Sequence, residues 1–312
     1  MNSVNANISI IMATYNRAHL IGDMLDSILK QSYPNWECII VNDGGTDDTD
    51  KIVNKYVQQD ARFRYHYRPS SYGKGLPGCR NFGLDKARGE YVVFFDDDDI
   101  VHPELLAISV KALHSGTFDF CQYQKQWFAD AAPVPEAYPD FLQLHTLDNT
   151  ALTDLITYKH AMASCTVLWK RSFLNERFDE QLQYAEEWEY YNRVFLQHAT
   201  FSGLVLKNVL YYNRKHPNSN TGEFFNQNKK RLDSQSLASY KLLCTYVRHM
   251  KHRQIQVIQH LLNIMIRNRS KELYVQSLNL LRLKGKKRLN KMAAYTLYPL
   301  YYPLYTLFHK LK

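Results

Sequence analysis

The sequence has little that could cross-link the chain or carry it through a bilayer. Its five cysteines are scattered, odd in number and form no C-x-x-C pair, which argues against a disulfide framework and a structural zinc site. No run of about 18 apolar residues occurs, so we expect no conventional membrane-spanning helix. The N-terminal residues lack a charged segment followed by an apolar one, so we expect no signal peptide. These absences fit a reducing, cytoplasmic compartment.

Two common nucleotide-binding signatures are also missing. No Gly-x-Gly-x-x-Gly motif follows the first apolar segment, and no Walker loop occurs in the chain. A dinucleotide-dependent oxidoreductase and a P-loop enzyme therefore lack support.

Short apolar segments alternate with amphipathic ones over the first two thirds of the chain. We expect strands at residues 8–13, 37–41, 63–67, 91–95, 118–122, 165–169 and 203–212, and the strand at 118–122 could continue through Trp127 and Phe128. We expect helices at about residues 20–29, 49–57, 78–87, 103–113 and 185–198. Strands that alternate with helices at this pitch predict a doubly wound, largely parallel α/β sheet.

The most distinctive segment is an apolar run that ends in four consecutive aspartates, at residues 91–99. Its β-branched and aromatic residues are typical of a buried strand, and ligands bind at the carboxyl ends of strands in open α/β sheets. Hard oxygen ligands there suit Mg²⁺ or Mn²⁺, which commonly bridge a carboxylate to substrate phosphates. A solvated acidic turn is the alternative interpretation.

Four segments of the sequence occur together in a recognisable order. They are SIIMATYNR (9–17), DSILKQSYPNWECIIVNDGGTDDT (26–49), CRNFGLDKARGEYVVFFDDDD (79–99) and FDEQLQYAEEWEYYNRVF (178–195). The chain resembles the family 2 inverting glycosyltransferases over roughly residues 8–221. The resemblance implies the GT-A fold, a doubly wound mixed sheet flanked by helices. Two positions depart from the family pattern: Gly45 replaces a serine, and Glu186-Glu187 replaces a Glu-Asp pair.

The resemblance also implies a nucleoside diphosphate sugar as donor, UDP-linked by family habit, and a divalent metal, Mn²⁺ or Mg²⁺. Tyr15 matches the position that stacks on the base, and Asp43 matches the acceptor of a hydrogen bond from the base. Asp98 matches the metal ligand. The expected donor-binding residues are Thr14, Tyr15, Asp43, Arg80, Asp96 and Asp97. The individual roles of Asp97 and Asp99 stay open.

Direct displacement at the sugar carbon needs a group that removes the proton of the acceptor hydroxyl. Glu187 matches the general base of the family, with Glu186 beside it. A solvated acidic helix start is the alternative interpretation of these residues. The resemblance further implies that His216 completes the metal site, whereas a purely structural histidine is equally compatible with the sequence.

The last part of the chain has a different composition. We expect a catalytic domain at residues 1–225 and a helical C-terminal region at residues 226–312. No Asp or Glu follows Glu272, while eight Lys or Arg do, and the last of them flank Tyr- and Leu-rich segments. This profile is typical of an interfacial membrane segment, so we expect a peripheral location on the inner face of the plasma membrane. Docking of the tail on the catalytic domain or on another subunit is the alternative, and the oligomeric state stays open.

The favoured function is sugar transfer to a glycan or glycolipid acceptor in bacterial surface-polysaccharide synthesis. A glycoside hydrolase would also use two carboxylates, but would not need a nucleotide-facing set of residues. A sugar nucleotidyltransferase would carry a glycine-rich N-terminal loop, and this sequence has none. A catalytically weak nucleotide-sugar-binding protein and a basic nucleic-acid-binding protein are the remaining alternatives. The net charge of +9 is compatible with the latter, but no recognition motif supports it, so we expect no nucleic acid partner.

Overall fold

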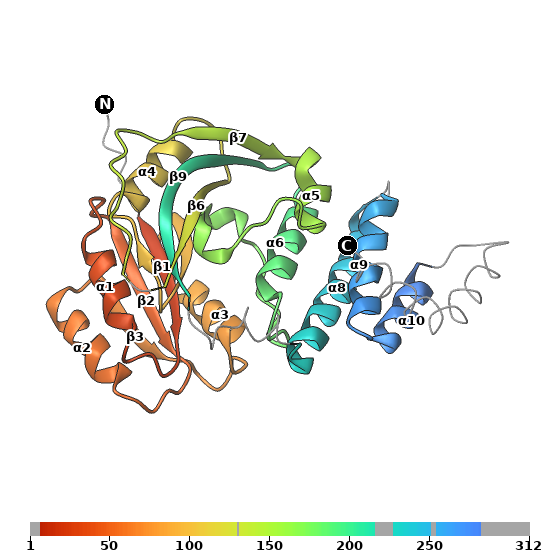
Figure 1. The fold of residues 1–312 in the computed structure, drawn as a ribbon, viewed down its shortest axis with the longest axis horizontal. Coiled ribbons are helices and arrows are strands. Elements are labelled where there is room, and N and C mark those ends of the chain that lie inside the picture. Colours follow the sequence, from red (N-terminus) through yellow and green to blue (C-terminus); the bar gives the residue numbers. More distant parts are fainter. Residues whose placement is uncertain (1–6, 130, 216–226, 251–253, 282–312) are drawn as a thin grey trace. The chain divides into compact units, whose positions relative to one another are not determined.

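The computed structural model describes residues 7–129, 131–215, 227–250 and 254–281 (Figure 1). The chain divides into two compact units. Unit 1 comprises Met1–Ala151, Ala161–Gln181 and His198–Ser219; unit 2 comprises Leu152–His160, Leu182–Gln197 and Asn220–Lys312. The expected domain boundary near residue 225 stays a prediction.

The described part of unit 1 contains a nine-stranded mixed sheet in the order β3-β2-β1-β4-β8-β6-β9-β5, with β7 also paired to β9. The strands are β1 (Ile8–Thr14), β2 (Trp36–Asn42), β3 (Phe63–Tyr67), β4 (Tyr91–Asp96), β5 (Ile100–Val101), β6 (Phe120–Phe128), β7 (Gln143–Asp148), β8 (Val167–Lys170) and β9 (Ser202–Arg214). The first four strands of this order are mutually parallel. β8 then runs antiparallel between β4 and β6.

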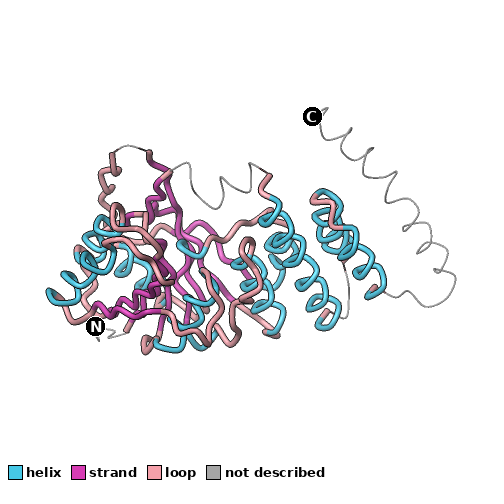
Figure 2. Tube along the Cα trace, turned by 90° about the horizontal axis from the view of Figure 1, so that it is seen from below, coloured by secondary structure: helices cyan, strands magenta, loops and turns pink. Residues whose placement is uncertain are grey.

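Helices cover both faces of this sheet (Figures 1 and 2). They are α1 (Ile21–Leu29), α2 (Thr49–Gln59), α3 (Leu76–Lys86) and α4 (Leu105–Leu113). Apolar residues of α1, α2 and α4 pack with alternate residues of β1, β2 and β4, such as Ile10, Ile40 and Val93. α3 packs on the opposite face, where a Cβ on Gly83 would lie 2.4 Å from Cγ2 of Ile11. The expected mixed sheet flanked by helices is confirmed.

Several local expectations need correction. The fifth strand starts at Phe120, two residues later than expected, and its continuation to Phe128 is confirmed. Pairing with β9 supports its polar second half. The segment at 165–169 begins as a 3-10 turn, and its strand starts at Val167. β7 was not predicted, since Leu147 is its one buried residue and the segment shows no alternation of apolar and polar residues. The sheet is less parallel than expected because of the antiparallel β5, β7 and β8.

The described part of unit 2 is helical, which confirms the expected helical C-terminal region. Its helices are α5 (Leu152–Ile156), α6 (Glu186–Gln197), α8 (Lys229–His249), α9 (Ile255–Arg267) and α10 (Lys271–Leu280). α8 packs against α6, α9 and α10. None of the described helices combines the length and the apolar character needed to cross a membrane. The basic, aromatic tail at residues 285–312 lies outside the described residues.

Candidate active site

Three parallel strands end at the same edge of the sheet in unit 1. Thr14 at the end of β1 pairs with Asn42 at the end of β2, and Ala13 pairs with Asp96 at the end of β4. The polar turns that follow these strands therefore converge, as the carboxyl ends of parallel strands do in open α/β sheets. This register brings the expected donor-side residues of the first, second and third motifs to one place.

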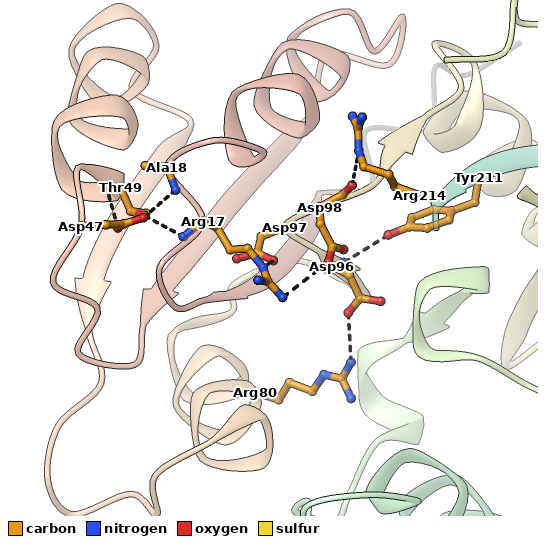
Figure 3. Close-up of polar contacts among 10 residues, drawn as sticks. All are labelled: Arg17, Ala18, Asp47, Thr49, Arg80, Asp96, Asp97, Asp98, Tyr211 and Arg214. Carbon is orange, nitrogen blue, oxygen red and sulfur yellow. Dashed lines mark hydrogen bonds and ion pairs between the residues drawn. The ribbon is translucent and has the colours of Figure 1, made fainter. Parts of the chain in front are cut away.

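Asp96 is the most accessible of the four consecutive aspartates. Its side chain is 40% exposed, and its Oδ1 lies 3.5 Å from Nη2 of Arg80. The Asp96 N–H donates to the phenol oxygen of Tyr211 at 3.1 Å (Figure 3). Arg80 comes from α3, is almost fully buried, and has its guanidinium over the rings of Phe94 and Phe178. These contacts aim a fixed cation at the open side of Asp96.

Arg17 places a second cation beside the next two aspartates. Its Nε lies 3.4 Å from Oδ1 of Asp97, and its Nη2 lies 3.6 Å from Oδ2 of Asp98 (Figure 3). The turn that carries Arg17 is held by α2, because the Arg17 N–H donates to Oγ1 of Thr49 at 3.0 Å. A guanidinium thus offsets the repulsion between adjacent carboxylates at the end of β4.

Asp97 is buried, and its environment disfavours the charged form. Burial, followed by the negative charge of Asp98, raises the pKa of Asp97 to about 7, although the hydroxyl of Thr14 and the guanidinium of Arg17 oppose the shift. Oδ2 of Asp97 is buried and accepts no hydrogen bond within normal geometry. Asp97 therefore has the properties of an interior group more than those of a ligand-facing one.

Asp99 anchors the turn to β9. Its Oδ2 accepts from Nδ2 of Asn213 at 2.8 Å, and its Oδ1 accepts from the N–H of Arg214 at 2.7 Å. The side chain of Arg214 donates from Nε to the backbone oxygen of Asp98 at 3.0 Å. Burial and the nearby negative charges raise the pKa of Asp99. The last aspartate of the run thus holds the turn in place, which leaves the first and third for ligands.

The base-facing residues lie at the ends of β1 and β2. The ring of Tyr15 is 47% exposed, and Nζ of Lys74 lies 5.5 Å from its centroid. Asp43 accepts from Nε of Arg68 at 2.5 Å and from the N–H of Gly75 at 3.0 Å. Because a carboxylate offers about four lone-pair sites, Asp43 retains capacity for at least one further donor. Thr14 is buried, and its backbone oxygen accepts from the Asp43 N–H.

The loop between β3 and α3, and α3 itself, are fastened to the first residues of the fourth quoted segment, residues 178–195. Asn81 of α3 exchanges two hydrogen bonds with the backbone of Phe178. Glu180 accepts from Nδ2 of Asn81 and from the N–H of Gly73. These contacts are within unit 1, and they hold the loop whose Gly75 bonds Asp43.

The expected general base lies in unit 2. Glu187 is in the first turn of α6 and is half-buried, whereas its neighbour Glu186 is buried. Glu189 is also buried and forms a bidentate ion pair with Arg193, at 2.7 and 3.0 Å. Among these three carboxylates, Glu187 is the most accessible. Trp188 packs inside unit 2, where its indole N–H donates to the backbone oxygen of Ile156.

Known proteins are similar to this chain in sequence and in fold. Residues 9–177 match the model of glycosyl transferase family 2. The chain belongs to this family. A relative, the uncharacterized glycosyltransferase EpsJ of Bacillus subtilis, is 30% identical over 223 residues, which are 69% of this chain and 62% of EpsJ. The chain therefore spans less than two thirds of that relative.

Two solved structures show that this family 2 chain has the GT-A fold. TarS from S. aureus, in complex with UDP-GlcNAc, superposes with a TM-score of 0.63 at 20% identity and covers 87% of this chain and 79% of TarS. The mannosyltransferase PcManGT from Pyrobaculum calidifontis, in complex with GDP-Man and Mn²⁺, superposes with a TM-score of 0.56 at 18% identity. It covers 97% of this chain and 83% of PcManGT.

Two carboxylates of this family 2 site could supply the protein share of the coordination of a divalent metal. Among the described residues, no group of three or more His, Cys, Asp or Glu has the geometry to hold a metal ion. The accessible carboxylate of Asp96 and that of Asp98 supply hard oxygen donors at the sheet edge. One or two carboxylates completed by substrate phosphates are the usual protein share of a Mg²⁺ site, so the residues fit. His216, the other expected metal ligand, lies outside the described residues.

Several residues at this family 2 site were not assigned a role from the sequence. Arg17 lies within a quoted motif, and its charge was the available signal. Arg68, Tyr211 and Asn213 lie far along the chain from the carboxylates and backbone that they contact, so no local pattern marks them. The expected roles of Thr14, Tyr15, Asp43, Arg80, Asp96, Asp97, Asp98 and Glu187 stay predictions.

Proposed function

We propose that this protein transfers a sugar from a nucleoside diphosphate sugar, UDP-linked, to an acceptor hydroxyl with inversion at the sugar carbon. The observation that carries the proposal is the convergence of Tyr15, Asp43, Arg80 and Asp96 at one edge of the sheet. An exposed aromatic ring, a carboxylate held by two hydrogen bonds and a fixed guanidinium suit a ligand that combines a base, phosphates and a sugar. The complex of TarS with UDP-GlcNAc supports the uridine base.

The donor would lie across the strand ends from β2 to β4. The exposed ring of Tyr15 offers a stacking surface for the base, which contributes roughly 1–3 kcal/mol in comparable sites. Asp43, fixed by Arg68 and Gly75, accepts a hydrogen bond from the N–H of the base. Arg80 neutralises negative charge next to Asp96, where the diphosphate would lie. Preorganised cations of this kind stabilise a leaving group as its charge develops.

Asp98, with Asp96, would hold a divalent metal together with the diphosphate. The Mn²⁺ in the complex of PcManGT supports such an ion. When bound, the metal supplies positive charge to the departing diphosphate. The guanidinium of Arg17 lies beside Asp98 and offsets part of its negative charge. The site without donor therefore attracts a cation less strongly than four adjacent carboxylates would.

Glu187 would act as the general base. In a single displacement, the acceptor oxygen bonds to the sugar carbon as the bond to the diphosphate breaks, and the hydroxyl proton passes to the carboxylate. Its accessibility, in contrast with the buried Glu186 and the ion-paired Glu189, supports this choice. The proposal includes a place in bacterial cell-surface glycan synthesis. It also includes peripheral attachment to the inner face of the membrane through the C-terminal tail.

Release of nucleoside diphosphate from a panel of nucleotide sugars, with Mn²⁺ or Mg²⁺ and then with chelator, tests the proposal. We expect UDP sugars to be turned over and chelator to stop release. Glu187→Gln should lower transfer by roughly 10²–10⁴-fold, while donor binding by calorimetry is kept. Glu180→Gln is unsuitable as a control because Glu180 holds a loop. Glu272→Gln, which changes an exposed carboxylate in the first turn of α10, serves instead and should keep turnover. Unchanged turnover in Glu187→Gln would contradict the assignment.

A further inference from the structure

One exposed aromatic side chain in unit 1 has no part in the proposed donor site. Trp127, near the end of β6, is 51% exposed, whereas Trp36, Trp169 and Trp188 are buried. The chain has four tryptophans in all. A large amphipathic ring that stays at the surface is the profile of a binding anchor rather than of a core residue.

Two lysine side chains lie close to this ring. Nζ of Lys125 lies 5.1 Å from its centroid, and Nζ of Lys215 lies 5.6 Å from it. Lys125 precedes Trp127 by two residues on β6, while Lys215 follows the end of β9, where its N–H donates to the backbone oxygen of Phe128. Two ammonium groups, one from β6 and one from the residue after β9, therefore lie near the same indole ring. We call Lys125, Trp127 and Lys215 the cationic tryptophan site.

The register of the sheet ties this site to the acidic turn. Trp127 pairs with Asn213 of β9, and Asn213 donates to the carboxylate of Asp99. The acidic turn leads directly into β5, which pairs with the other side of β9. β6 and β5 thus lie two strand spacings apart, roughly 10 Å. A bound chain that covers Trp127 would lie within roughly 10 Å of the strand that follows the acidic turn.

We propose that the cationic tryptophan site binds the acceptor, and that the acceptor is an anionic glycan. The apolar face of a sugar ring packs on the indole, and the two ammonium groups bind a negatively charged substituent, either a carboxylate or a phosphate diester. This proposal rests on the proposed function, since it names the acceptor class of the same enzyme. The link through Asn213 to Asp99 places the site near the reaction site. It therefore favours a glycan acceptor as the ligand, rather than a membrane surface.

Quenching of tryptophan fluorescence reads this site directly, because the other three indoles are buried. We expect a polygalacturonate oligomer or a poly(glycerol phosphate) oligomer to protect the full-length protein from iodide quenching, while a neutral malto-oligosaccharide protects weakly. The oligomer that protects better identifies the charged group. Trp127→Phe should lose the signal yet retain binding by calorimetry.

Variants separate the two parts of the site. Trp127→Ala should weaken binding of the preferred oligomer roughly tenfold or more, and Lys125→Gln with Lys215→Gln should weaken it similarly and flatten its salt dependence. Two control variants should leave binding unchanged. Leu144→Ala removes another exposed apolar side chain. Lys111→Gln combined with Lys229→Gln removes two exposed charges elsewhere.

Unchanged binding in Trp127→Ala, or binding of neither anionic oligomer, overturns the proposal. Protection by phosphatidylglycerol vesicles alone overturns it too, in favour of a membrane contact. Donor turnover separates this test from that of the proposed function. Trp127→Ala should still hydrolyse the UDP sugar slowly in the absence of acceptor. A protein that binds the oligomer through Trp127 but turns over no nucleotide sugar would contradict the proposed function and leave the glycan site standing.

Discussion

Among single residues, Asp97 shows how burial at the sheet edge affects stability. A carboxyl whose pKa is raised in the folded protein binds its proton more tightly there than in the unfolded chain. The stability that this proton contributes is fully present below the ordinary pKa of 3.8 and is lost as the pH rises through about 7. The charged form of Asp97 is therefore a destabilising element at neutral pH.

Asp97→Asn should remove this dependence. In metal-free protein without donor, we expect the free energy of unfolding of the variant, relative to the parent, to rise between pH 4 and pH 7 by up to about 4 kcal/mol. Urea unfolding at each pH measures the difference. Asp140→Asn is the control: Lys111 holds the pKa of Asp140 below its usual value, so its effect is confined to lower pH. A flat difference for Asp97→Asn would contradict the burial argument.

Arg17 and Arg80 divide the acidic run between them at the residue scale. Arg17 contacts Asp97 and Asp98, and Arg80 contacts Asp96. Asp99 is instead held by β9. Four identical side chains in sequence therefore have four different environments, and only the first and third are left with access to a ligand.

Among the elements, α3 sets the position of Arg80. The helix lies so close to β1 that a Cβ on Gly83 would meet Cγ2 of Ile11 at 2.4 Å. Ile11 is fully buried in β1, so it has no free space to move into. The absence of a side chain at Gly83 is thus a condition for the approach of α3 to the sheet and for the 3.5 Å contact of Arg80 with Asp96.

Gly83→Ala should therefore destabilise the protein by about 1–3 kcal/mol through overpacking, and should weaken donor binding by shifting Arg80. Chemical denaturation and donor titration measure the two effects. Gly22→Ala in α1 is a matched control, because the added Cβ would lie 3.8 Å from the hydroxyl of Tyr56, and alanine favours a helix. Equal stability of the two variants would show that α3 can move away from β1 without cost.

At the scale of the whole molecule, the positive charge is concentrated after Glu272, where eight Lys or Arg and no acidic residue occur. Each basic residue near an anionic surface contributes about 1 kcal/mol to membrane binding. Deletion of residues 285–312 should therefore move the protein from the membrane fraction to the supernatant, with donor turnover in solution unchanged. Fractionation of cells that express each form measures this.

A narrower variant tests the cause. Replacement of Lys286, Lys287 and Arg288 by Gln keeps the aromatic residues and removes three charges. We expect partial release, increased further by high salt. A truncated protein that still sediments with membranes would exclude the tail as the anchor.

The sequence by itself determined which segments form the strands of the β1–β4 region and which residues follow them. Periodicity and apolar character are local properties, so the strands at residues 8–13 and 37–41 and the acidic turn after residue 95 could be predicted. The family follows from the same segments. It did not reveal β7, whose residues are mostly exposed and whose pairing comes only from β9.

Only the tertiary structure decided how the acidic run is divided and what surrounds it. Asp99 meets Arg214, 115 positions away along the chain, and Asp43 meets Arg68 across the turn that follows β3. The tertiary structure also brought Lys215, 88 positions further along the chain, beside Trp127 and Lys125. Such contacts depend on strand order and register, which arise from the packing of the whole sheet, because no periodicity within one segment specifies which distant side chain will lie beside it.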